Sequence, residues 1–350
     1  MKGQTPARWA LCLAAGVVLI AAGGQAASVD GAGARLEARP LRVAVVVDPP
    51  AGSRDPWGRM AVAGLREAVA RLGVDREAAK VLRPSPKEGY LPTLLYLGRR
   101  RYDLVIGVGY AQARAIDIAA RKFPQSRFVL VDEDYTALPH RPRNAAAVTF
   151  ASEEAGYLAG YLAGLVERRA PGRHAIGSVG GKKAPQVDRF IAGYQAGARR
   201  AAPGITVLNG YAHGFFASQR ARCRNVALRQ IARGAGVVFN VAGACGLGAL
   251  GAAKEKAVWG IGVDVDESSL GRYILTSAVK NVDAAIFETV RATQRGRLAL
   301  GRTTVLGVRQ RAVGLGRISS RVPRELVSRV DRVQRLIAAG RIRGIPTRLR

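Results

Sequence analysis

Residues 258–280 read VWGIGVDVDESSLGRYILTSAVK, two apolar runs on either side of an acidic loop. In the first run, apolar side chains alternate with glycine at Trp259, Ile261 and Val263. A short apolar run bounded by glycines is typical of an interior strand of an α/β sheet. The segment therefore predicts a buried strand, a loop and a second strand within one α/β layer.

The charged residues of this segment fall where the two predicted strands end. Asp264 lies just past the first strand, and Lys280 closes the run after the second, which we expect over residues 273–277. Open α/β sheets bind ligands at this edge, where a carboxylate accepts bonds from sugar hydroxyls or a purine N–H and a lysine donates. A surface acidic turn beside a solvated lysine would show the same letters, so these residues alone leave both interpretations open.

The rest of the chain alternates strand-like runs with longer helical patterns, which is typical of βαβ units around a parallel sheet. We expect strands over residues 41–47, 102–108, 128–131, 145–150, 174–179, 206–210 and 236–241, and helices over 60–72, 112–122, 153–166, 186–202 and 218–233. The series restarts after Phe150. Two doubly wound α/β lobes are therefore predicted, which suits a length of 350 residues.

The amino-terminal residues have the pattern of an export signal. Residues 1–27 contain Lys2 and Arg8, an apolar run at 9–22 and a small-residue end, which predicts a secretory signal peptide. No other segment approaches the roughly 20 apolar residues of a membrane span. We therefore expect an exported protein of the periplasm or the outer face of the plasma membrane, without a membrane anchor of its own.

The cysteines bear on the same prediction. Cys12 lies inside the apolar run and would be removed with it, so it does not serve as a lipid-attachment site. Cys223 and Cys245 remain in the mature chain. Two cysteines can pair in an oxidising compartment, but small buried thiols are also common, and the sequence does not fix the distance between these two. Whether they form a disulfide stays open at this point.

The formal net charge of +30 raises the question of nucleic-acid binding. The basic residues, mostly arginine, are spread over all segments, and no nucleic-acid-binding motif accompanies them. We therefore expect no nucleic-acid partner. Residues 291–350 are the most arginine-rich part, and they suit either a solvated charged face or a peripheral contact with an anionic membrane surface.

Several loops that follow predicted strands contain residues suited to ligand contact. Asp48 follows the first strand and Trp57 opens the next helix, while glycine-rich turns follow later strands at residues 107–110, 177–181 and 241–246. Glycine lets the backbone approach a ligand and lets helix N-termini present their N–H groups. Glycine also serves ordinary tight turns and a tryptophan also serves a core, so no single loop decides between binding and packing.

Taken together, the motifs resemble the basic membrane protein family of ABC-transporter substrate-binding proteins, whose purine-nucleoside receptors are its best understood branch. The resemblance runs from Leu41 to about Pro346. The matching blocks, in this order, are YDLVIGVG (102–109), FPQSRFVLVD (123–132), EEAGYLAGYLAGL (153–165), IGSVGG (176–181), RFIAGYQAGA (189–198), VVFNVAGACGLGALGAAKE (237–255), IGVDVDESS (261–269), LTSAVKNVDAAIFE (275–288) and VPRELVSRVDRVQRLIAAGRI (322–342).

The resemblance implies a type I periplasmic-binding-protein fold, with two doubly wound parallel-sheet lobes joined by a hinge. Lobe one would contain residues 41–149 and about 278–311, and lobe two residues 150–277 and about 312–346. The lobes would close on a small molecule in the cleft between them, in a state that an ABC permease and ATPase complex recognises. The implied ligand is a nucleoside, with a purine nucleoside as the first choice.

The resemblance also implies a binding site, in which each family position is matched to one residue of this chain. Asp48 matches the family's first-strand aspartate, and Asp132 matches the carboxylate after the third strand. Asp264 and Lys280 match an acid and base that read the ribose or the base, and Gly243 matches the glycine of the family's VAG loop. These residues are therefore expected to face one cleft.

The two aromatic positions depart from the family pattern. Where the family has an aromatic residue followed by asparagine, this chain has Trp57 followed by Gly58, which keeps a stacking surface but lacks the amide. For the second stacking position we favour Phe216, with Phe215 behind it, and Gln219 stands where an aspartate usually follows. These departures leave a different nucleoside, a modified base or another small polar solute open.

Two other classes of function compete with solute delivery. A nucleoside-processing enzyme would need a metal-binding carboxylate cluster, or His-x-Glu with Pro-Cys-x-x-Cys, and the sequence has neither. His140, His174 and His213 are isolated, so we expect no enzyme, no catalytic residue, no metal site and no cofactor. The alternative that stays open is a ligand-sensing receptor of the same fold that feeds a signalling partner.

Overall fold

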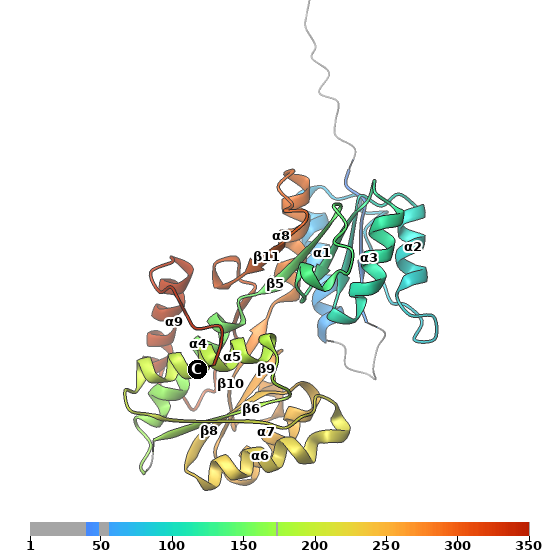
Figure 1. The fold of residues 1–350 in the computed structure, drawn as a ribbon. Coiled ribbons are helices and arrows are strands. Elements are labelled where there is room, and N and C mark those ends of the chain that lie inside the picture. The colour runs from blue at the N-terminus through green and yellow to red at the C-terminus, as the bar shows by residue number, and fades with distance from the viewer. Residues whose placement is uncertain (1–39, 49–55, 173, 350) are drawn as a thin grey trace, which may run out of the picture. The chain divides into compact units, whose positions relative to one another are not determined.

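Two six-stranded sheets organise the part of the chain that the computed structural model describes, residues 40–48, 56–172 and 174–349 (Figure 1). The predicted signal peptide, residues 1–27, lies outside the described residues. Within them, no helix combines the length and the apolar character that a membrane crossing requires. The predicted α/β class with two parallel-dominated sheets is confirmed.

The first sheet has the strand order β11-β5-β4-β3-β1-β2, and all neighbouring strands in it are parallel. Its strands are β1 (Val43–Val46), β2 (Lys80–Leu82), β3 (Leu104–Val108), β4 (Arg127–Val131), β5 (Ala145–Phe150) and β11 (Thr303–Leu306). Alternate side chains of β1 point to opposite faces, and both sets are fully buried because helices cover both faces. This explains the unbroken apolar run at the start of the fold.

Four helices cover the first sheet. They are α1 (Pro56–Leu72), α2 (Leu91–Arg99), α3 (Ala113–Lys122) and α8 (Val282–Gln294). α1 and α8 pack in the same core cluster as Val43 and Val45, whereas α2 and α3 pack with Ala44 and Val46. Each pair therefore covers one face.

The second sheet repeats the arrangement with the order β12-β10-β9-β8-β6-β7. Its strands are β6 (Ala175–Gly180), β7 (Thr206–Tyr211), β8 (Ala235–Val241), β9 (Trp259–Asp264), β10 (Ile274–Lys280) and β12 (Val313–Leu315). All neighbours are parallel except the edge strand β12, which runs antiparallel to β10. The helices are α4 (Ser152–Glu167), α5 (Pro185–Ala201), α6 (Arg220–Ala232), α7 (Leu247–Glu255) and α9 (Arg324–Ala338).

Glycines allow α4 and α5 to pack side by side at very close range (Figure 1). A Cβ atom at Gly160 of α4 would lie 1.9 Å from the carbonyl oxygen of Tyr194 on α5. A Cβ at Gly197 of α5 would lie 2.0 Å from the carbonyl oxygen of Tyr157 on α4. Both distances are far shorter than a carbon–oxygen contact allows, so only glycine permits this backbone approach.

The chain passes between the two sheets after β5, after β10 and after β11. The boundary predicted near residue 278 falls inside β10, which belongs to the second sheet. We therefore propose to place that lobe boundary at Asn281, between β10 and α8. The other lobe boundaries stay predictions.

The C-terminal helix α9 is strongly amphipathic. Leu326, Val330, Val333 and Ile337 are buried, because their spacing of three or four residues places them on one helical face. The arginines of the helix are exposed. Its positive charge therefore faces solvent, and the membrane contact expected of this arginine-rich segment stays a prediction.

Candidate functional site

In both sheets the chain winds outward in two directions from a central pair of strands, β1 and β3 in the first sheet and β6 and β8 in the second. Loops that leave such a pair at the carboxyl edge separate and leave a crevice, which is where open α/β sheets bind ligands. Asp48 and Gly109 follow the first pair, and Gly181 and Gly243 follow the second. The topology therefore places the predicted glycine-rich loops at ligand-binding edges.

A cavity of about 360 Å³ is lined by the carboxyl-edge loops of both sheets together with the start of α5. This volume is at the lower end of the range for small-molecule sites. A hollow of about 580 Å³ lies along α1 and one of about 710 Å³ lies mainly along α8, and neither is lined by a predicted site residue. The cavity is lined by Tyr110, Asp132, Glu133, Ala184, Gln186, Val187, Phe190, Phe215, Val241, Gly243, Val263, Asp264 and Lys280.

Lys280 is the central charged residue of the cavity. Its side-chain nitrogen lies 3.0 Å from Asp132 Oδ1 and 3.2 Å from Asp264 Oδ1, although only 6% of the residue is exposed. The same nitrogen lies 5.4 Å from the ring centre of Phe190 and 5.9 Å from that of Trp57. Because a buried charge is costly without partners, the two carboxylates and the aromatic faces are what make this lysine tolerable.

The two carboxylates occupy matching positions in the two sheets. Asp132 directly follows β4 and has a φ of 71°, and Asp264 ends β9 with a φ of 64°. A left-handed backbone is disfavoured for residues with a Cβ, and aspartate tolerates it better than most. Such strained positions persist where the surrounding structure fixes them, and they cluster at functional sites. Here the turn at each strand end presents the carboxylate to the cavity.

The charges of the cavity are coupled. Burial raises the pKa of Asp132 to about 6, although the positive charge of Lys280 opposes this rise. Burial alone would lower the pKa of Lys280, but attraction to Asp132 and Asp264 outweighs it and raises that pKa. At neutral pH the cavity therefore contains the ammonium group of Lys280 beside the ionised carboxylate of Asp132.

Asp264 keeps an oxygen available for a ligand. Its Oδ1 is buried and pairs with the Lys280 nitrogen at 3.2 Å, while the side chain as a whole is 32% exposed. The exposed part of the carboxylate can accept a hydrogen bond from a ligand donor. Asp264 is thus a built acceptor at the cavity wall.

The predicted residues Asp132, Phe215, Gly243, Asp264 and Lys280 all line this cavity. Trp57, at the start of α1, does not line the cavity, but its ring centre lies 5.9 Å from the Lys280 nitrogen. Asp48 does not line the cavity in this structure. It is exposed, and its Oδ1 accepts a hydrogen bond of 2.8 Å from the hydroxyl of Tyr90.

Gly58 also does not line the cavity but is buried in α1. The position favoured for the second aromatic needs revision, because Phe215 lines the cavity and Phe216 is 69% exposed. The physical reason is the hydrogen bonding of this irregular segment. Gln219 Oε1 accepts from the backbone N–H groups of both phenylalanines, which fixes the direction in which each side chain leaves the backbone.

Some cavity residues were not anticipated from the sequence. Glu133 follows Asp132, and its Oε1 accepts a hydrogen bond of 3.2 Å from Gln186 Nε2 at the start of α5. This bond joins a loop of the first sheet to a helix of the second. Phe190 was expected only as part of the helix 186–202, without a role in binding. Tyr110, 69% exposed, lies in the glycine-rich turn 107–110 that was expected to suit ligand contact, and the acidic run that continues beyond Asp132 was the signal available for Glu133.

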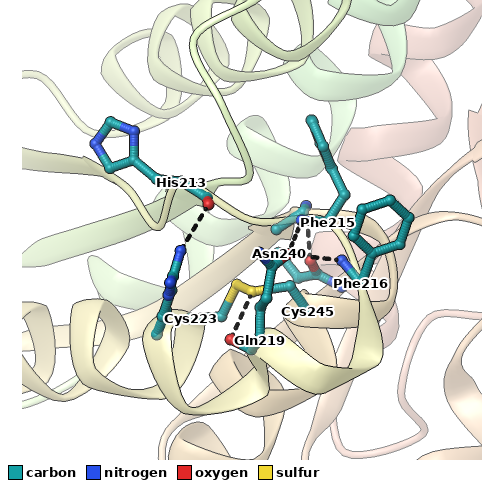
Figure 2. The surroundings of a disulfide bond; sticks show 9 residues. His213, Phe215, Phe216, Gln219, Cys223, Asn240 and Cys245 are labelled. Carbon is teal, nitrogen blue, oxygen red and sulfur yellow. Dashed lines mark hydrogen bonds between the residues drawn. A yellow bond between two sulfur atoms is a disulfide. The ribbon is translucent and has the colours of Figure 1, made fainter.

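Cys223 of α6 and Cys245 form a disulfide, with their Cα atoms 5.8 Å apart (Figure 2). This settles the question that the sequence left open. Cys245 belongs to the short turn after β8 that also contains the cavity residue Gly243. No cluster of three histidine, cysteine, aspartate or glutamate side chains suited to a metal ion occurs in the described part of the chain.

A family model described as ABC transporter substrate-binding protein, PnrA-like, matches residues 41–344. The chain belongs to this family. It is therefore a substrate-binding protein of an ABC transport system and not an enzyme, and such proteins bind a small molecule and work with a permease and an ATPase. The expectation of a non-enzymatic binding protein is confirmed by this membership.

Two relatives of known name cover 95% and 61% of this chain. A CD4+ T-cell-stimulating antigen of Listeria innocua is 27% identical over 95% of this chain and 96% of its own length. The ABC transporter nucleoside-binding protein BmpA of Lactococcus lactis is 32% identical over 61% of this chain and 64% of its own length. Among solved structures, an ABC transporter solute-binding protein from Conexibacter woesei has a TM-score of 0.67 at 23% identity, covering 88% of this chain and all of that chain, and it supports the fold.

Proposed function

We propose that this substrate-binding protein binds a nucleoside, with a purine nucleoside as first choice, in the cavity between Asp132, Phe215 and Asp264. The observation that carries the proposal is the partly exposed carboxylate of Asp264, ion-paired to Lys280, in the wall of a cavity that also has aromatic walls. A ribose hydroxyl is a short neutral donor and acceptor that suits a carboxylate and an ammonium group at once.

The rest of the cavity suits a flat, partly polar base. Phe190 and Phe215 supply apolar ring surface, on which base stacking is worth about 1–3 kcal/mol. Glu133 and Gln186 supply a carboxylate and an amide for the edge of a base. One relative, the Lactococcus protein, carries a name that describes nucleoside binding, which supports the same ligand class.

The two lobes would close on this ligand as a hinge. The cavity walls come from loops of both sheets, and the chain connects the sheets through the segments after β5, β10 and β11. Closure would bury the nucleoside and present a joint surface to the permease. We place this activity outside the cytoplasm, in the periplasm or at the outer face of the plasma membrane, as the predicted signal peptide indicates.

Calorimetric titration of the mature protein tests the ligand. The panel contains inosine, guanosine, adenosine and uridine, together with ribose, a free purine base, arabinose and a small amino acid. We expect saturable binding of one or more nucleosides and much weaker binding of ribose or base alone, because each half fills only part of the site. Tight binding of a sugar or an amino acid with no binding of any nucleoside would contradict the proposal.

A further inference from the structure

Phe215 lines the cavity from a segment that has little regular structure. It lies between the end of β7 at Tyr211 and the short 3-10 turn Ala217–Gln219 that precedes α6. His213 in the same segment has a φ of 52°. A ring on such a segment would lose considerable conformational freedom when it orders around a ligand. Contacts outside the regular backbone ladder must therefore hold it.

The first of these contacts is the side chain of Gln219. Its Oε1 accepts a hydrogen bond of 2.9 Å from the backbone N–H of Phe215 and one of 3.1 Å from that of Phe216 (Figure 2). A Cβ atom at Gly214 would lie 2.6 Å from this oxygen, so the glycine before Phe215 is what leaves room for the amide. One side chain thus satisfies two backbone donors beside the cavity.

The second contact comes from the turn after β8. The backbone N–H of Cys245 donates to the carbonyl oxygen of Phe215 at 3.1 Å. A Cβ at Gly181 would lie 2.3 Å from the ring of Phe215, so the ring packs directly on that glycine. The backbone N–H of Gly214 also donates to the carbonyl oxygen of Gly181 at 3.0 Å. The ring is therefore held between the loops that follow β6 and β8.

The disulfide joins the two contacts covalently. Cys223 lies one helical turn after Gln219, and its bond to Cys245 links the start of α6 to the turn after β8. The carbonyl oxygen of Gln219 lies 3.1 Å from the sulfur of Cys245. Both cysteines are fully buried. The disulfide thus links two groups that bond to the backbone of Phe215: the side-chain amide of Gln219 and the N–H of Cys245.

We propose that Gln219 and the Cys223–Cys245 disulfide are positioning elements that hold Phe215 in its ligand-ready place before the ligand arrives. This inference rests on the proposed function. A prearranged wall raises affinity because less ordering free energy is lost on binding. The residue that replaces the family's usual aspartate therefore acts through the backbone of Phe215 rather than by contact with the ligand.

The test compares three variants with the wild type. Gln219→Ala removes the acceptor, Gln219→Glu keeps an acceptor oxygen at the same chain length, and Cys223→Ala/Cys245→Ala removes the covalent link. Gln334→Ala is the matched control, because this partly buried glutamine of α9 does not line the cavity. Two properties are measured: the affinity for inosine by calorimetry, and amide hydrogen exchange of residues 213–219 and 243–246 in the ligand-free protein.

We expect Gln219→Ala and the double cysteine variant to bind inosine about tenfold more weakly, since ordering one loop typically costs this much. In both, the amides of Phe215, Phe216 and Cys245 should exchange faster before any ligand is added. Gln219→Glu should restore slow exchange of the two phenylalanine amides, which a general loss of stability would not do. Gln334→Ala should match the wild type in both measurements.

The experiment distinguishes a wrong ligand from a wrong positioning role. If the wild type binds no nucleoside, the proposed ligand is wrong, and the exchange data on the ligand-free protein still decide the positioning role. Unchanged exchange at Phe215 and Phe216 in both Gln219→Ala and the double cysteine variant would overturn the inference. The inference would also be overturned if the wild type binds inosine and the folded Gln219→Ala variant binds it with the same affinity.

Discussion

The side-chain nitrogen of Lys280 lies 3.0 Å from Asp132 Oδ1, and this ion pair connects the last residue of β10 in the second sheet to the residue after β4 in the first. The pair is largely buried, and the ring centres of Phe150 and Phe190 lie 5.9 and 5.4 Å from the lysine nitrogen. It therefore couples the two halves of the cavity through charge. A substitution of Lys280 or of Asp132 should therefore affect both lobes.

Replacing Lys280 by methionine keeps an unbranched apolar stem, one atom shorter, but leaves two carboxylates without their shared cation. Truncating one partner of a buried ion pair typically costs about 3–5 kcal/mol, because the other charge stays buried. We expect a loss of this order in the free energy of unfolding, measured by urea denaturation. Adding Asp132→Asn to the Lys280→Met variant should restore part of the lost free energy of unfolding. If the losses of the two single variants instead add up in the double variant, the two side chains do not interact.

Binding should weaken at acidic pH. Burial raises the pKa of Asp132 to about 6, so below this pH the carboxylate becomes neutral and no longer holds Lys280 in place or accepts a ligand donor. The nucleoside affinity of the wild type should therefore fall as the pH drops from about 7.5 to about 5. In Asp132→Asn that fall should be much smaller. A wild-type affinity that is flat over this range would contradict the role assigned to Asp132.

Unlike nucleoside binding, the stability of the folded protein should decrease as the pH rises, because of Glu167, the last residue of α4. Only 3% of Glu167 is exposed, and burial raises its pKa to about 7, so the folded state favours the protonated carboxyl. The stability from this group is fully present below the unfolded pKa of about 4.5 and is lost as the pH rises through about 7.

Glu167→Gln should remove this loss and stabilise the protein by up to about 3 kcal/mol above pH 8 relative to the wild type. Glu267 is buried and its pKa is also raised to about 7, so the wild-type slope includes both groups and the informative quantity is the difference between variant and wild type. Glu255→Gln, at a surface carboxylate, is the control. Equal stability of Glu167→Gln and the wild type at pH 8 would show that Glu167 is not held in a desolvated site.

The close packing of α4 on α5 gives a pair of opposite expectations. Gly160→Ala would place a Cβ 1.9 Å from the Tyr194 carbonyl oxygen, so the helices must separate, and we expect a loss of about 1–3 kcal/mol or more. Gly251→Ala, in the exposed part of α7, meets nothing within 4 Å and should be neutral or stabilising by about 0.5–1 kcal/mol. Thermal unfolding of both variants checks this contrast.

The bond between Glu133 and Gln186 should contribute modestly to the bound state. It connects exposed side chains of the two lobes at 3.2 Å, so each of Glu133→Ala and Gln186→Ala should weaken nucleoside binding by about two- to fivefold. The double variant should lose less than the product of the single losses, because both changes remove the same bond. Fully multiplicative effects would show that the two side chains act on the ligand independently.

Much of the fold was predictable because its strands are buried on both faces. Runs such as Val43–Val46 and Leu104–Val108 are apolar throughout, and burial on both faces requires that pattern. Strands β2, β11 and β12 were not predicted, because each has only three or four residues and is held by its neighbours in the sheet rather than by its own pattern. Helices α2, α7, α8 and α9 were not predicted either, and in α7 the glycine content weakens the helical signal.

The binding site was less predictable than the strands. Asp264 could be placed because it follows a predicted strand at the ligand-binding edge of a parallel sheet, and Asp132 was assigned through the family resemblance. The choice between Phe215 and Phe216 could not be predicted, since it depends on the two N–H bonds to Gln219. The disulfide likewise depends on α6 and the turn after β8 meeting in space, which residue spacing alone does not reveal.

The most direct test of the proposed function is the affinity of Asp264→Asn for the nucleoside that the wild type binds best, measured by calorimetry at pH 7.5. Asparagine keeps the shape but loses the charged acceptor, so we predict an affinity about ten- to a hundredfold lower, with Asp331→Asn on α9 unchanged as the control. Wild-type affinity in a folded Asp264→Asn variant would contradict the account, because the carboxylate beside Lys280 would then not be where the ligand binds.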